Sequence, residues 1–159
     1  MTYVLGALIL PLLLVFGLYH LLTWLNFYHI NSLLYWRRVA LVSAIAHVLL
    51  VSGFFIFSYA DFTANRQILL LGENFGSFLF NRSEFWTLML IFDPAPTALM
   101  LGLFALLDRM GLNPPRLLLV SMAIVYLVGT AQWYWIGGTI GVAFEKVWAG
   151  LKAGQDEED

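Results

Sequence analysis

Asp93 is the strongest candidate for a functional residue, because it is the one charged residue between positions 85 and 107. An ionised Asp in the middle of a lipid-facing helix costs about 2.5–3.5 kcal/mol, and such residues often lie in proton or ion paths. Asp followed at once by proline is also typical of a helix N-terminus, with Asp93 as the N-cap and Pro94 at the first helical position. We expect the capping role, and a place in an ion or proton path is compatible with it.

His20 and His47 form a second candidate site, because they lie in two apolar stretches that a short connection joins. In antiparallel neighbouring helices both imidazoles would lie at similar depth, and facing histidines in a helix bundle can ligate a b-type haem. Ser43 lies one helical turn from His47 and could join its hydrogen bonds. A lone histidine in a membrane helix more often hydrogen-bonds a neighbouring helix, so haem ligation stands as the alternative.

Pairs of small residues indicate where helices could approach closely. Gly137 and Gly141 are four positions apart, as are Ala98 and Gly102. This spacing lets two helix backbones come together in a membrane. It predicts helix packing without identifying the partner helix.

The motifs of common enzymes are missing from the sequence. It contains no glycine-rich phosphate loop, no HExxH and no serine nucleophile elbow, so we expect a chain that is not itself an enzyme and holds no metal. The chain has no cysteine, which excludes disulfides, thiolate metal sites, iron–sulfur clusters and covalently attached haem. A net charge of −2 without a basic stripe gives no reason to expect a nucleic-acid partner.

The composition indicates a membrane protein. Of 159 residues, 61% are hydrophobic and 11% are charged, whereas soluble domains have roughly a quarter charged residues. Four apolar stretches reach the length of about 20 residues that a membrane-spanning helix needs, and they cover about residues 2–25, 39–60, 85–107 and 117–136. We therefore predict an all-α, polytopic bundle of four transmembrane helices that forms one domain over residues 1–144.

The connections and the C-terminus add detail to this bundle. The residue before a proline avoids helical geometry, so the third span should be broken at Asp93. The segment QILLLGENFGSFLF, residues 67–80, is too short to span and too apolar for water, which predicts an interfacial or re-entrant segment. The acidic tail, residues 145–159, should be disordered.

The orientation is inferred from the basic residues. Lys and Arg are tied at four on each side of the predicted bundle. The first span has no Lys or Arg before it and is followed by Arg37 and Arg38, which places both termini outside the cytoplasm. The expected location is a bacterial cytoplasmic membrane.

Three functions remain open at this point. We favour a structural or accessory subunit of a larger integral membrane complex, with the lipid bilayer and other membrane subunits as partners, because it explains the apolar residues 67–80. The first alternative is a haem- or quinone-binding anchor of a respiratory or photosynthetic redox complex, using His20 and His47. The second is a small ion- or proton-conducting protein that uses Asp93. The aromatic content of 16% would also suit contacts with a bound pigment or lipid.

Overall fold

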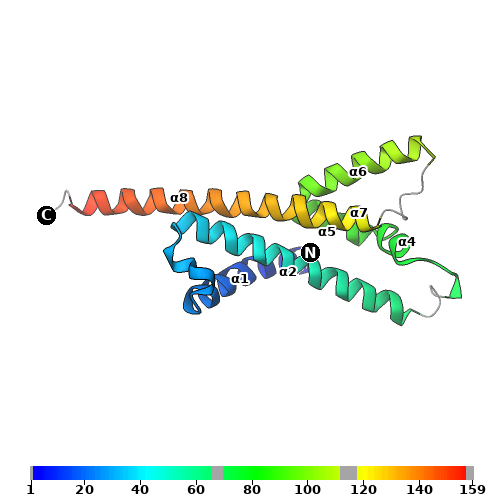
Figure 1. Ribbon diagram of the computed structural model, residues 1–159, viewed down its shortest axis with the longest axis horizontal. Helices are drawn as coiled ribbons and strands as arrows, with labels where there is room; N and C mark the ends of the chain where they lie inside the picture. The colour runs from blue at the N-terminus through cyan, green and yellow to red at the C-terminus, as the bar shows by residue number, and fades with distance from the viewer. Residues whose placement is uncertain (1, 66–69, 112–117, 157–159) are drawn as a thin grey trace. The chain divides into compact units, whose positions relative to one another are not determined.

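The computed structural model describes residues 2–65, 70–111 and 118–156, and every element in these ranges is a helix (Figure 1). Helices account for 89% of the structure, and no strand occurs in the described ranges, which confirms the all-α prediction. In chain order the elements are α1 (Thr2–Trp24), η1 (Phe27–Ser32), α2 (Tyr35–Ala64), α4 (Phe75–Phe80), α5 (Ser83–Phe92), α6 (Pro94–Arg109), α7 (Leu118–Ile124), the π-helical η3 (Val125–Gly129) and α8 (Thr130–Asp156).

Within the described residues, two helices are long and apolar enough to cross a membrane. One is α2, and the other is the continuous run Leu118–Leu151, which joins α7, η3 and α8. The apolar helical segments Ile9–Trp24 and Ser83–Phe92 are shorter. The predicted four-span bundle is therefore not confirmed.

By its contacts the chain divides into two compact units. Unit 1 comprises residues 1–47 and 131–159, and unit 2 comprises residues 48–130. Helix α2 begins in unit 1 and ends in unit 2, and α8 has all but its first residue in unit 1.

In unit 1, α1 folds back on the first part of α2. The buried side chains of Leu22, Ile30 and Val42 form the core between them. The rings of Tyr19 and Tyr35 lie 6.0 Å apart, next to the connection. Arg38 stabilises this connection, because its guanidinium donates hydrogen bonds to the carbonyl oxygens of Leu33 and Asn31, each at 2.8 Å.

The same unit contains a close crossing of α2 and α8. A Cβ atom on Gly137 would overlap Ser43 Oγ, and one on Gly141 would lie 2.6 Å from Trp36 Cα. Only glycine allows such an approach, so the prediction from the spacing of Gly137 and Gly141 is confirmed. The Trp36 N–H donates to Glu145 Oε1 at 3.2 Å, and thus a side chain of α8 binds a free N–H at the start of α2.

The end of α8 differs from the expected tail. The helix continues past Ile136, where we expected the fourth span to end, and reaches Asp156. Residues 145–156 contain two lysines, two alanines, a leucine, a glutamate and a glutamine, all of which are strong helix formers. The tail that we expected to be disordered is therefore helical up to Asp156.

Unit 2 has a core of apolar side chains from α2, α4, α5, α6 and η3. Its fully packed members are Val51, Phe55, Leu79, Phe85, Met89, Met100 and Val125. Of the predicted interfacial segment, residues 67–69 lie outside the described residues, while Leu70 and Leu71 are 86% and 77% exposed. The rest forms α4, which begins at Asn74 with a side-chain cap on the Ser77 N–H at 2.9 Å and buries Phe78 and Leu79.

Helices α5 and α6 form an antiparallel hairpin in unit 2. The ring of Phe104 in α6 lies 6.1 Å from Trp86 in α5 and 5.2 Å from Phe80 just before it. In one straight helix, 18 positions would separate residues 86 and 104 by about 27 Å. The break at Asp93 is thus confirmed, but residues 85–107 turn back on themselves and do not form one continuous helix.

The glycine contact in unit 1 yields a stability prediction. Gly141→Ala places a Cβ against the backbone of Trp36, and we expect the free energy of unfolding in detergent to fall by about 1–3 kcal/mol. Gly102→Ala is the matched control, because a Cβ there meets nothing within 4 Å and alanine raises helix stability by about 1 kcal/mol. Equal effects of the two substitutions on unfolding, followed by tryptophan fluorescence, would contradict the close crossing.

Candidate functional site

Asp93 lies at the turn of the α5–α6 hairpin. Its N–H still donates to the Met89 carbonyl oxygen at 2.8 Å, as in a helix, but its φ of −132° and ψ of 61° end α5. The ring of Pro94 disfavours helical geometry at the residue before it, which explains why the helix ends at this position. The residue is buried, with 2% of its surface exposed.

The carboxyl of Asp93 does not serve as the side-chain cap of α6. Asp93 occupies the predicted cap position, with Pro94 next, but its side chain makes no capping hydrogen bond. Pro94 and Pro96 have no N–H to donate. The Thr97 N–H and hydroxyl both donate to the main-chain oxygen of Asp93, at 3.0 and 2.7 Å. Asp93 therefore holds the predicted N-cap position, without a capping bond from its side chain, and Thr97 secures the helix start through the main-chain oxygen of Asp93.

The Asp93 carboxyl is thus a buried acidic group at the beginning of α6. Asp93 is the only charged residue of the hairpin between Glu84 and Asp108. The N-terminus of a helix carries partial positive charge, and Asp93 lies at the N-terminus of α6. Acidic residues within membrane segments often mark proton or ion paths, so Asp93 stays the candidate residue for such a path.

A π-helical turn packs against the same hairpin. Residues Val125–Gly129 form η3, which contacts α6. Single π-helical turns inside α-helices occur frequently at functional sites. Nearby in the chain, Ser121 is buried at 3% exposure and its hydroxyl has no hydrogen-bond partner, while Tyr126 and Ser52 share a hydrogen bond of 2.9 Å.

The residues around Asp93 were missed in the sequence for a physical reason. A Thr four positions after a helix start, as at Thr97, is common. A π turn leaves no composition signal, because it depends on how the helix packs. Only the prolines at positions 94 and 96 gave a local indication that the carboxyl would have few N–H groups to cap.

The two histidines lie in different surroundings within unit 1. His20 is exposed, and its ring contacts Phe16 and Tyr19 of its own helix, at centroid distances of 4.4 and 5.8 Å. His47 is 1% exposed and its ring lies 5.7 Å from that of Trp133. A bis-histidine haem needs both imidazoles to face one space. Haem ligation by His20 and His47 therefore stays a prediction, with one imidazole exposed and the other buried.

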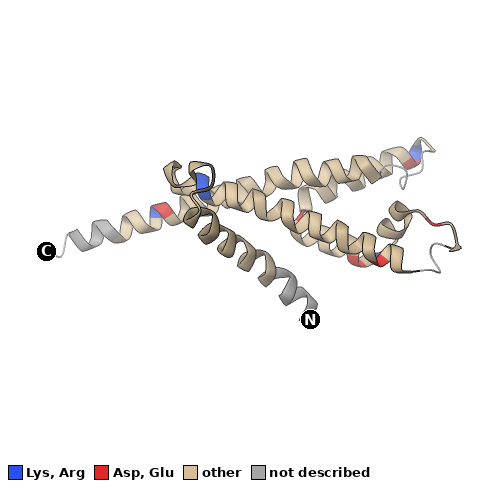
Figure 2. Ribbon diagram, turned by 60° about the horizontal axis from the view of Figure 1, so that its bottom comes forward, with Lys and Arg blue, Asp and Glu red and all other residues tan. Residues whose placement is uncertain are grey.

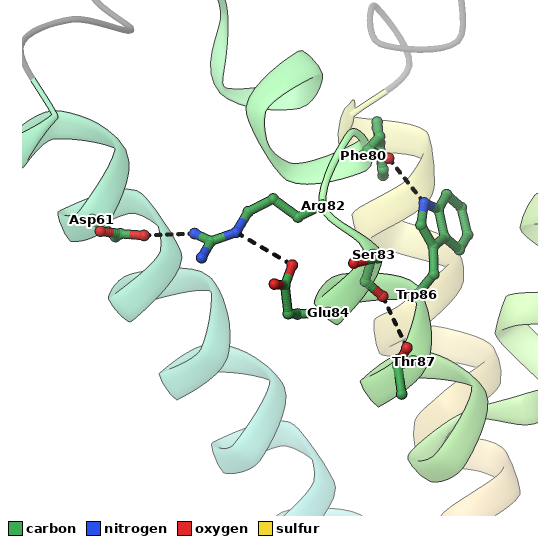
Figure 3. Close-up of polar contacts among 7 residues, drawn as sticks. All are labelled: Asp61, Phe80, Arg82, Ser83, Glu84, Trp86 and Thr87. Carbon is green, nitrogen blue, oxygen red and sulfur yellow. Dashed lines mark hydrogen bonds and ion pairs between the residues drawn. The ribbon is translucent and has the colours of Figure 1, made fainter. Parts of the chain in front are cut away.

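A charged cluster holds the start of the hairpin in unit 2 (Figure 3). Arg82 lies between Asp61 at the end of α2, at 2.5 Å, and Glu84 in α5, at 3.9 Å, and its guanidinium lies 5.0 Å from the Phe78 ring centre. The Trp86 indole N–H donates to the Phe80 carbonyl oxygen at 2.9 Å. These contacts connect α2, α4 and α5, and we had not singled them out in the sequence.

The bond from Thr97 to Asp93 can be tested directly. Thr97→Val keeps the shape of this buried side chain but removes the hydroxyl, so we expect the free energy of unfolding to fall by about 0.5–1.5 kcal/mol. Thr97→Ser keeps the hydroxyl and serves as the control. If serine destabilises the chain more than valine in a detergent unfolding titration, the hydroxyl does not support the helix start.

Comparison of the chain with protein-family models, curated protein sequences and solved structures gives no match. The function is therefore inferred from the chain's own geometry.

Proposed function

We propose that this chain is a structural or accessory subunit of a larger integral membrane complex, located in a bacterial cytoplasmic membrane. One observation carries the membrane part of the proposal. In the most apolar window of the helical run Leu118–Leu151, only 17% of the residues are buried. An apolar helix is either packed inside a large core or surrounded by lipid, and this helix has little protein around it.

Other helices expose apolar side chains in the same way. Leu12 and Phe16 of α1 are 69% and 65% exposed, and Leu106 of α6 is 55% exposed. Moving one such side chain out of water contributes roughly 1.5–3 kcal/mol. Lipid or neighbouring membrane helices would supply this stabilisation, which supports α1, α2 and the run Leu118–Leu151 as bilayer crossings.

The two pairs of small residues support a partner subunit. On α8, the space beside Gly141 is occupied by Trp36 of the same chain. On α6, a Cβ on Gly102 meets nothing within 4 Å. Ala98, one turn earlier on α6, is also exposed. Lipid tails do not require small residues, but a closely packed helix does. The α6 pair is therefore available to a helix of another membrane subunit.

Native purification in mild detergent, followed by mass spectrometry, tests this proposal. We expect other membrane proteins at stoichiometric levels with the unaltered chain, and their loss with Gly102→Leu, because the larger side chain keeps a partner helix away. Ala143→Leu, at another exposed small residue, should keep them. A chain that purifies alone or only with its own copies would contradict the accessory role.

Proton or ion conduction through Asp93 is the second candidate, favoured by the burial of this one charged residue between positions 85 and 107. If the chain conducts, Asp93→Asn should abolish proton or cation flux into proteoliposomes, since the amide cannot carry the charge, while Asp61→Asn at the exposed end of α2 should retain it. No flux with the unaltered chain would leave the accessory role as the only proposal.

A further inference from the structure

We propose that α5 and α6 enter and leave the bilayer on the same side, as a re-entrant hairpin that holds the Asp93 carboxyl near the middle of the membrane. This inference rests on the proposed membrane role and adds a topology to it. It also changes the number of crossings from four to three, with α1, α2 and the run Leu118–Leu151 as the crossing segments.

The lengths of the two arms fit this arrangement. Helix α5 has 10 residues, which is about 15 Å of helix and half of a hydrocarbon core of about 30 Å. Helix α6 has 16 residues, or about 24 Å, enough to return from the middle and reach the headgroups. The turn at Asp93 is thus placed at the depth where a half-crossing would end.

Charges lie at both ends of the hairpin. Arg82 and Glu84 lie at the start of α5, and Asp108 and Arg109 lie at the end of α6. Figure 2 shows that the ribbon of α6 is uncharged along its length until this end. Charged residues at both ends and apolar arms between them match a segment whose two ends meet the same aqueous face.

Aromatic side chains mark the same level on both arms. Trp86 of α5 and Phe104 of α6 have ring centroids 6.1 Å apart, next to Phe80. Tryptophan prefers the boundary between lipid and headgroups. Because Arg82 binds Asp61, the end of α2 belongs to this face as well.

Unit 1 gives an independent observation that agrees with three crossings. Glu145 of α8 binds the Trp36 N–H at the start of α2, and Tyr19 near the end of α1 contacts Tyr35. The later part of α8 therefore lies at the same end of unit 1 as the connection between α1 and α2. The start of α1 lies at the opposite end, so the two termini lie on opposite sides of the membrane, in place of our expectation that both lie outside the cytoplasm.

Single cysteines test this topology, and the absence of native cysteine makes each one unique. Four exposed positions suit the test: Ser83 and Met110 at the ends of the hairpin, Ser32 before α2, and Ala149 in the later part of α8. A membrane-impermeant maleimide is applied to spheroplasts and to inside-out vesicles from cells expressing the full chain. A thiolate in water reacts, and a thiol in lipid does not.

We expect Ser83→Cys and Met110→Cys to be labelled from one side only, and Ser32→Cys and Ala149→Cys from the other side only. Labelling of Ser83→Cys and Met110→Cys from opposite sides would overturn the hairpin, since residues 85–107 would then cross. Ala95→Cys, next to the turn, should be labelled from neither side, and its labelling from the Ser32 side would also overturn the hairpin. Recovery of the unaltered chain in the soluble fraction would instead refute the membrane role itself.

Discussion

The constraint on which the rest of unit 2 depends is the helix break at Asp93 and Pro94. Proline cannot continue the hydrogen bonds of α5, and it disfavours helical geometry at the residue before it. Thr97 then secures the new helix by two bonds to one main-chain oxygen. Because of this break, α6 lies beside α5, and the buried side chains of Met89 and Met100 join one core.

The glycine crossing has the corresponding role in unit 1. Gly137 and Gly141 let α8 approach α2 so closely that Glu145 reaches the first turn of that helix. Contacts of this kind depend on van der Waals packing and a few hydrogen bonds, and they are the interactions that hold helices together in lipid. The outer surfaces of the same helices expose apolar side chains, which suits contact with lipid.

Local chemistry accounts for the parts of the structure that the sequence predicted. The helical class, the break at Asp93 and the contact at Gly137 each follow from residues within a few positions of one another. The direction of α6 could not be predicted, because a crossing and a fold-back have the same hydropathy and differ only in contacts such as that of Phe104 with Trp86. The different surroundings of His20 and His47 could not be predicted either, because they depend on helix packing and not on the spacing of the two residues in the sequence. The π turn that begins at Val125 has no signal in the amino-acid composition.

The distance between the two arms of the hairpin tests the central claim most directly. Spin labels on Thr87→Cys and Ala105→Cys, both at exposed positions, can be placed without removing any native cysteine. The fold-back predicts two labels on adjacent helices, with strong dipolar broadening of the spectrum in detergent and in bilayers. A straight or merely kinked span would place these residues about 27 Å apart, and a narrow distribution near that distance would contradict the hairpin.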